Sequence, residues 1–215
     1  MRNAFADQLY ANASRDSRVA IVVADISPAG PMKQFRDDYP DRFVNVGVAE
    51  QAMTGLAAGM ALRGMRPFTY TIATFALYRP FEMVRDDLAY QNLPVTVVGI
   101  GGGVIYSTLG GTHHAQEDVV IAGAIPNMTV LTPSDAAEVR AATDFCVSRP
   151  DDSGPVYLRL GKAGESDLTA EAVEPYEQGR LRYLRKGSDV CVLSYGVVAR
   201  LGGQVARALS DRGRS

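Results

Sequence analysis

Short apolar runs rich in β-branched residues recur along most of the chain, at residues 19–23, 43–46, 68–72, 95–100, 128–131 and 156–160. Between them, apolar or small residues with helical spacing predict helices at about 3–11, 49–63, 80–91, 115–123 and 135–147. Buried strands that alternate with helices favour a parallel sheet, because right-handed crossovers place the helices over its faces. The pattern therefore predicts an α/β fold in which helices cover both faces of a parallel sheet.

A second pattern begins after a stretch with a different composition. Residues 164–179 become acidic and lose the apolar period, which is typical of a linker. An apolar run at 190–195 then predicts a strand, and the spacing at 197–209 predicts a helix. One strand and one helix cannot bury a core alone, so we expect the start of a truncated α/β domain or a segment that docks on another subunit. The predicted division is a domain at 1–165, a linker at 166–180 and an incomplete domain at 181–215.

Composition and charge exclude several classes of protein. The 215 residues are 47% hydrophobic with a net charge of −2, enough for a full core but without a basic stripe for nucleic acid or a polybasic membrane patch. Cys146 and Cys191 are far apart and outside any metal-ligand spacing. No signal peptide opens the chain, and the longest apolar run, 95–105, is too short to span a bilayer. We therefore expect a cytoplasmic protein.

Glu50 is the first candidate for chemistry. It follows a predicted strand end at 44–48 and lies on the first turn of a helix rich in Ala and Gly. The positive end of the helix stabilises a carboxylate there, and the small residues allow another backbone to lie close. The alternative is a helix-end charge without further function.

Three aromatic residues follow the strand at 68–72. Phe75, Tyr78 and Phe81 recur at every third position, with a helix expected to begin at Pro80. This spacing places them on roughly one side, where they could form a flat apolar slot for a planar heterocycle. The alternative is an aromatic cluster that fills the core.

Both histidines of the chain, His113 and His114, lie on one loop at 110–118. Proton transfer or hydrogen bonding to a polar substrate suits them, because an imidazole titrates near neutrality. A zinc site would need further ligands at matched spacing, and a surface loop without function is the remaining alternative. The glycines at 99–103 do not fit a dinucleotide fingerprint, because Val104 replaces the last glycine and no convincing helix follows. We expect them to allow close approach to the backbone.

Together these segments resemble the pyrimidine-binding domain of the transketolase family, which includes deoxyxylulose-phosphate synthase and the β subunits of 2-oxoacid dehydrogenases. The resemblance covers about residues 1–165, and residues 180–215 are similar to the opening strand and helix of that family's C-terminal domain. The motifs that carry it are Val22-Val23-Ala24-Asp25, Asn45 to Met53, the spacing of Phe75, Tyr78 and Phe81, Gly111-Thr112-His113, and Leu131-Thr132-Pro133-Ser134-Asp135.

The resemblance implies a site for thiamine diphosphate. Glu50 matches the acid that hydrogen-bonds N1′ of the aminopyrimidine ring and so promotes loss of the C2 proton of the thiazolium. His113 matches a histidine that faces the reacting carbon. The other matched cofactor positions are Val48 under the bent cofactor, Phe75, Tyr78 and Phe81 around the pyrimidine, and Asp25 near the cofactor across the interface between subunits.

The resemblance also implies a missing half. The chain has no Gly-Asp-Gly motif followed by an asparagine, so nothing in it resembles the site that binds Mg²⁺ and the diphosphate, and no metal ligand is assigned. We expect a separate N-terminal-half subunit to supply that site. The chain then resembles one subunit of a split transketolase that transfers a two-carbon ketol unit to an aldehyde acceptor, as a homodimer or in a heterotetramer.

The substrate side matches the family less well. Sugar-phosphate transketolases have a histidine and an aspartate where this chain has Gly101 and Leu109, and an arginine near Lys162. His114, Arg159 and Lys162 are the remaining candidates for a polar or anionic substrate. Two alternatives stay open: a β subunit of a 2-oxoacid or acetoin dehydrogenase, and a non-catalytic scaffold homologue.

Overall fold

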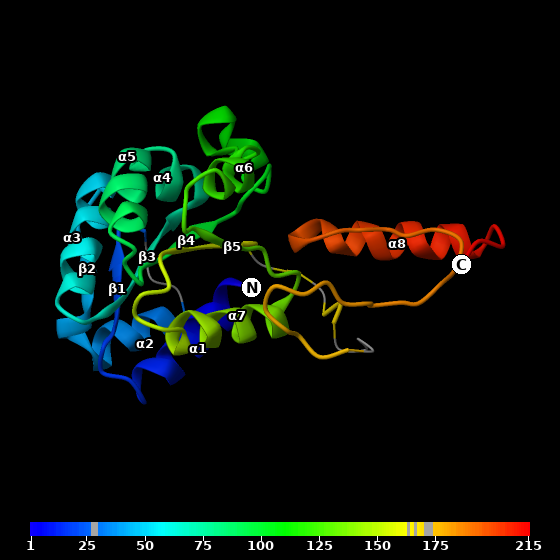
Figure 1. The fold of residues 1–215 in the computed structure, drawn as a ribbon. Helices are drawn as coiled ribbons and strands as arrows, with labels where there is room; N and C mark the ends of the chain where they lie inside the picture. The colour runs from blue at the N-terminus through cyan, green and yellow to red at the C-terminus, as the bar shows by residue number, and fades with distance from the viewer. Residues whose placement is uncertain (27–29, 163, 166, 170–173) are drawn as a thin grey trace.

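The computed structural model describes residues 1–26, 30–162, 164–165, 167–169 and 174–215. In this part of the chain six parallel strands form one sheet, with helices on both faces (Figure 1). The strands are β1 (Val19–Val23), β2 (Phe43–Asn45), β3 (Arg66–Ile72), β4 (Thr96–Ile100), β5 (Thr129–Leu131) and β6 (Val156–Leu160). The predicted α/β fold is confirmed.

The helices divide between the two faces of the sheet. Helices α1, α2 and α7 cover one face, while α3, α4, α5 and α6 cover the other (Figure 1). The bounds are α1 (Arg2–Ala13), α2 (Pro31–Asp38), α3 (Glu50–Leu62), α4 (Ala73–Leu77), α5 (Phe81–Met83), α6 (Asp118–Gly123), α7 (Ala136–Ser148) and α8 (Ala199–Ser210). A π-helical turn at Val84–Tyr90 extends α5, and single 3₁₀ turns occur at Pro40–Arg42, Ser107–Leu109, Gly111–His113 and Gly196–Val198.

The strand order creates a switch point in the sheet. The order across the sheet is β2-β1-β3-β4-β6-β5. The chain leaves β1 toward β2 on one side and then crosses back to β3 on the other, so the connections diverge around β1. In open parallel sheets, ligands bind outside the carboxyl ends of the strands at such a point.

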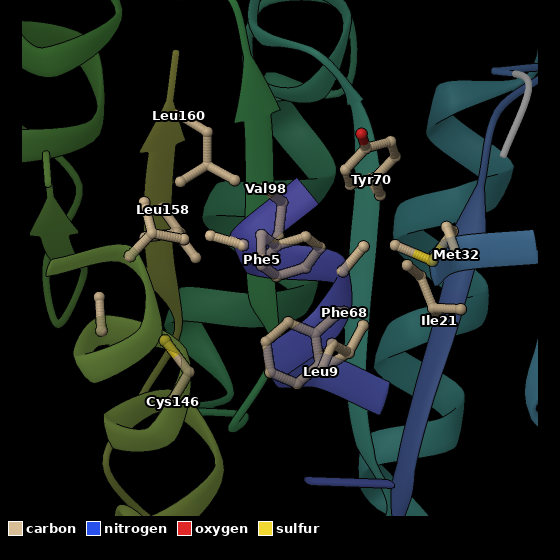
Figure 2. Packing of buried hydrophobic residues seen from close by; sticks show 14 of the residues in the cluster. Phe5, Leu9, Ile21, Met32, Phe68, Tyr70, Val98, Cys146, Leu158 and Leu160 are labelled. Atoms are coloured by element: carbon tan, nitrogen blue, oxygen red, sulfur yellow. The ribbon is translucent and has the colours of Figure 1, made fainter. Parts of the chain in front are cut away.

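The main core lies between the sheet and helices α1, α2 and α7. Phe5 stacks on Tyr70 with ring centroids 5.7 Å apart and lies 6.0 Å from the ring of Phe68 (Figure 2). Leu9 and Cys146 are buried in the same cluster. On the opposite face, Ala57, Ala58, Ala61 and other small side chains let α3 pack closely on the sheet.

Most predicted elements have the expected positions. The six strand predictions are correct to within two residues. The helix predicted at 80–91 is confirmed by α5 and the π-helical turn that extends it to Tyr90, and the separate helix α4, which begins at Ala73, was not predicted. Helix α2 was not predicted, because Met32 and Phe35 are its only buried side chains.

The strand predicted at 190–195 is wrong for this structure. Within the described part of the chain this segment forms no ladder, because no neighbouring strand accepts its backbone hydrogen bonds. Its apolar side chains remain outside a core, with Leu193 72% and Tyr195 53% exposed, and α8 extends beside the domain (Figure 1). The division at 165 and 180 stays a prediction, and residues 166 and 170–173 of the predicted linker lie outside the described residues.

The two thiols have opposite environments. Cys146 is buried under α1, and burial raises its pKa to about 11, whereas Cys191 is exposed. No helix among the described residues has the length and apolar character needed to cross a membrane.

Candidate active site

The candidate residues come from the carboxyl ends of several parallel strands. Asp25 follows β1, Glu50 follows β2, Phe75 follows β3, His113 lies in the connection after β4, and Lys162 follows β6. Since the strands are parallel, these ends lie along one edge of the sheet. The switch point around β1 lies at the same edge.

Glu50 begins α3 and is buried. The residue is only 2% exposed, and its Oε2 accepts a hydrogen bond from Nη1 of Arg79 at 2.7 Å. A carboxylate whose only partner was the helix dipole would remain in water, because burying an unpaired charge is costly. The structure instead holds Glu50 inside the site and pairs it with a cation from the chain after β3.

Arg79 connects Glu50 to the aromatic residues of the site. Its Cζ lies 4.3 Å from the ring centroid of Phe75, so the guanidinium covers the ring face. The other neighbour of Phe75 is His113, with ring centroids 5.1 Å apart at 72°. His113 in turn lies 6.3 Å from the ring of Tyr106. A continuous row of groups therefore runs from Glu50 to the loop after β4.

The contacts within this row show whether the residues fit an aminopyrimidine ring. The ring of thiamine diphosphate needs an apolar face to lie on and a carboxylate that shares a proton with its edge nitrogen. Arg79 presents a planar group that rests on Phe75 and donates an N–H to Glu50, which are interactions of the same kind. Phe75 and Glu50 thus fit the ring.

The three aromatic residues have different surroundings in this structure. Tyr78 packs against the core under α3 and donates from its hydroxyl to Glu117 Oε2 at 3.0 Å. Burial and this hydrogen bond hold the pKa of Tyr78 well above its ordinary value. Phe81 is 37% exposed. Phe75 lies in α4 and Phe81 begins α5, with a turn between them, and the slot itself stays a prediction.

The aromatic residues are not core filling. Phe75 is half-buried and Phe81 is exposed, and neither belongs to the buried clusters of the sheet. The core alternative is therefore wrong for these two residues. Tyr78 alone packs partly against the core.

The two histidines have different positions. His113 is half-buried, and its Nδ1 lies 3.0 Å from Thr112 Oγ1. Its contact with Phe75 brings this imidazole to the Glu50 side of the site. Nε2 of His114 is buried and finds no hydrogen-bond partner in the part of the chain that the structure describes.

The glycines after β4 make room for the protein's own side chains. A side chain at Gly101, where φ is +73°, would collide with the ring of Tyr106, and one at Gly102 would collide with Arg159. The expectation of close approach to this backbone is thus correct. Sequence reasoning did not identify Tyr106 as the group that approaches.

Arg159 and Lys162 have different availability for a substrate. Nε of Arg159 donates to Asp118 Oδ2 at 2.7 Å, the same oxygen that accepts from the hydroxyl of Tyr157 at 2.8 Å. Asp118 is fully buried, so Arg159 compensates its charge. The pairing occupies Nε of Arg159, and the assignment of Arg159 to the substrate stays a prediction. Lys162 is exposed, and its Nζ lies 5.0 Å from the ring centroid of Tyr106.

Asn45 holds the loops on both sides of the switch point. Its Oδ1 accepts from the backbone N–H of Asp25 at 3.1 Å and of Gly47 at 3.0 Å. Asp25 has a φ of +45°, which is unusual for a residue other than glycine. Asp25 and Val48 are exposed at this edge, Val48 to 72%, and the structure gives neither a direct contact with Glu50.

Sequence reasoning missed Arg79, Tyr106, Asn45 and Asp118. Arg79 lies inside the aromatic motif, and this position was a signal that it belongs to the site. Its partner Glu50, however, is 29 residues away in the chain. Among the residues that the structure describes, no group of three or more His, Cys, Asp or Glu could hold a metal ion.

The strand order and the buried carboxylate near the switch point define the pyrimidine-binding type of thiamine diphosphate fold. The transketolase pyrimidine-binding domain matches residues 1–164, and the chain belongs to this family.

Two curated relatives match nearly the whole chain. The 6-deoxy-6-sulfo-D-fructose transketolase subunit SqwH of a Clostridium species is 36% identical over 99% of this chain and 65% of the relative. A subunit of the apulose-4-phosphate transketolase of Phocaeicola vulgatus is 31% identical over 99% of this chain and 67% of the relative. The chain thus spans about two thirds of the length of these proteins.

A solved structure shares the fold. It is described as a split gene transketolase, an inactive β4 tetramer, and it superposes with a TM-score of 0.87 at 31% identity. The match covers 100% of this chain and 68% of that chain.

Proposed function

We propose that this chain supplies the pyrimidine side of the active site in a two-subunit, thiamine diphosphate-dependent transketolase. The observation that carries the proposal is the buried carboxylate of Glu50 beside the half-exposed ring of Phe75 at the switch point of the sheet. The relatives support the proposal, because both are named as transketolase subunits.

The residues of the chain have separate tasks in this proposal. Thiamine diphosphate, when bound, supplies a nucleophilic carbon that accepts the two-carbon ketol unit. Glu50 would hold a proton at N1′ of the ring, and Phe75 would pack against the ring face. His113 would exchange a proton with a substrate hydroxyl, because it is the imidazole that contacts Phe75. We propose weaker supporting contacts for Val48, Tyr78, Phe81 and Asp25, of which Tyr78 requires release from Glu117.

We propose an anionic sugar as substrate. Lys162 stands at the far end of the row from Glu50, and no carboxylate pairs with it among the described residues. An exposed ammonium at this position suits a phosphate or sulfonate. The names of the two relatives specify a sulfo sugar and a sugar phosphate, respectively. His114 would contact a polar group of the same substrate.

The proposal includes a partner subunit in the cytoplasm. The chain contains no Gly-Asp-Gly motif, so the partner would bind Mg²⁺ and the diphosphate. The solved β4 assembly, whose description calls it inactive, is in line with a subunit that needs a second kind of chain.

Reconstitution tests the function. The chain is mixed with its co-purified partner, thiamine diphosphate and Mg²⁺, and ketol transfer is measured with a panel of phosphorylated and sulfonated ketoses and an aldehyde acceptor. We expect turnover in the complex and none in either chain alone. Turnover of 2-oxoacids or acetoin instead would favour the dehydrogenase alternative, and efficient transfer by this chain alone would refute the split-site proposal.

A further inference from the structure

Arg79 makes both interactions expected of the cofactor ring. Its guanidinium is planar, lies 4.3 Å from the centroid of Phe75, and donates from Nη1 to Glu50 Oε2 at 2.7 Å. A guanidinium and an aminopyrimidine are both flat, nitrogen-edged groups that stack on aromatic rings and hydrogen-bond carboxylates. The two groups therefore compete for the same carboxylate and the same ring.

We propose that Arg79 is an internal competitor that occupies the pyrimidine position and sets the affinity of the chain for the cofactor. This inference rests on the proposed function of the site. Binding of the ring requires the guanidinium to leave Phe75 and Glu50, and departure of the ring allows it to return.

The surroundings of Arg79 allow this exchange. The side chain of Arg79 is 40% exposed, whereas that of Glu50 is 3% exposed. The cation can thus rotate into water while the carboxylate stays in place. Arg79 also immediately precedes Pro80, where the helical path is interrupted between α4 and α5, so no continuous helix packs over the side chain.

The ion pair also explains how a buried carboxylate is tolerated before the ring arrives. Glu50 would otherwise be buried with no charged partner among the described residues, which is unfavourable. Arg79 compensates the charge and keeps the Glu50 rotamer fixed. The same contact lowers apparent affinity, because only the fraction of molecules with Arg79 displaced can bind the ring.

Binding of the isolated pyrimidine tests the inference without any catalytic assay. The full chain is titrated with 4-amino-5-hydroxymethyl-2-methylpyrimidine by calorimetry, as wild type and as Arg79→Ala, Arg79→Lys and Arg85→Ala. We expect Arg79→Ala to bind the pyrimidine about tenfold more tightly than the wild type. This is the effect of freeing a site that Arg79 leaves open in about one wild-type molecule in ten. Arg79→Lys should lie between, because an ammonium can pair with Glu50 but cannot stack as a plane.

Arg85→Ala is the matched control. Arg85 is an exposed arginine six positions later whose ion pair among the described residues is with its neighbour Asp86, and its removal changes the net charge equally. We expect wild-type affinity for this variant. Side-chain NMR of Arg79 gives a second readout, since its guanidinium signals should move to solvent-like positions as the pyrimidine is added.

The outcomes separate the inference from the proposed function. Weaker or unchanged binding by Arg79→Ala overturns the competition, and weaker binding would identify Arg79 as a ligand of the ring. Glu50→Gln in the Arg79→Ala background tests the site itself. If that double variant binds the pyrimidine as well as Arg79→Ala does, or if no variant binds it, the proposed pyrimidine site fails as well.

Discussion

A buried carboxylate at the start of a helix is costly to maintain, and Glu50 shows how this chain maintains it. Glu50 lies at the helix N-terminus and pairs with the guanidinium of Arg79, which itself rests on the ring of Phe75. These groups stabilise the charge of Glu50 at the position where the pyrimidine ring is proposed to bind. The role of Glu50 in this arrangement can be tested by substitution.

Glu50→Gln should affect activation more than binding. The amide keeps the shape and one hydrogen bond but loses the acid–base function at N1′, so C2 deprotonation should slow on the order of a hundredfold or more. The measurement is proton–deuterium exchange at C2 of thiamine diphosphate in the reconstituted complex. Asp86→Asn, which removes an exposed carboxylate outside the site, serves as comparison. An unchanged exchange rate in Glu50→Gln would show that Glu50 is a helix-end charge only.

Asn45 offers a second test at the scale of one residue. In Asn45→Ala the amides of Asp25 and Gly47 lose their acceptor, and we expect their hydrogen exchange to accelerate by about two- to tenfold, since each hydrogen bond contributes about 0.5–1.5 kcal/mol. Asn45→Asp keeps an acceptor oxygen and should restore the protection. Amide exchange by NMR measures both variants. Equal exchange in the Ala variant and the wild type would contradict the role of Asn45.

The sequence predicted the residues of the site better than their contacts. The structure brings the candidates Glu50, Phe75 and His113 into one row, in which Arg79 joins Glu50 to Phe75 and Phe75 contacts His113. The ion pair of Arg159 with Asp118 was missed, because Asp118 lies on another element and only the fold reveals the pairing. Periodicity reports which side of one helix a residue occupies, and the turn between α4 and α5 separates Phe75 from Phe81.

At the scale of elements, the strands were predicted well because buried parallel strands are continuous apolar runs. The strands β1 and β4 are buried along their whole length, which favours apolar residues, whereas the edge strands β2 and β5 are only partly buried. Helix α2 escaped prediction because only Met32 and Phe35 face the core. The run at 190–195 has the composition of a buried strand, but a strand needs partners, and composition does not state whether a partner is present.

Helix α7 depends on a buried cap. Asp135 Oδ1 accepts from the N–H of Glu138 at 3.0 Å, and Oδ2 accepts from the N–H of Leu168, the N–H of Thr169 and the hydroxyl of Thr169. Burial alone would raise the pKa of Asp135, but the hydrogen bonds from Glu138 and Thr169 outweigh it, and the pKa lies below its ordinary value. The cap therefore joins the start of α7 to the chain after β6.

Asp135→Asn should destabilise the fold by about 1–3 kcal/mol at neutral pH, because an amide cannot accept all these bonds. A lowered folded-state pKa stabilises the fold above the unfolded pKa, and this contribution disappears as the pH falls through the folded value. The difference between variant and wild type should thus be largest near pH 7 and shrink below about pH 4. Urea unfolding at several pH values measures it. A difference that is constant with pH would contradict the account.

At the scale of the whole molecule, α3 presents a smooth outer face. Gly55 and Gly59 are exposed, and a side chain added at either would meet no atom within 4 Å, while Leu62 is 61% exposed. Ala58 lies on the same helix but is buried against the sheet. Two such helices can approach closely, and we expect this face to join two copies of the chain.

Gly59→Leu tests this assembly. The variant fills open space in one copy and should raise its helix stability by up to about 1 kcal/mol, but it would block a close helix contact. Light scattering should give a dimer or larger assembly for the wild type and the 23.1 kDa monomer for the variant. Gly123→Leu, at an open glycine in α6, is the control. An unchanged mass in Gly59→Leu would exclude α3 as the contact.

The different environments of the two cysteines allow the C-terminal segment to be labelled selectively. The thiolate is the reactive form, and the raised pKa and complete burial of Cys146 keep it away from alkylating reagents while the domain is folded. Cys191 is exposed on the segment that lacks a strand partner. A maleimide fluorophore or spin label added to the natural chain would therefore mark the C-terminal segment selectively, and its signal would follow the docking of that segment without any engineered residue.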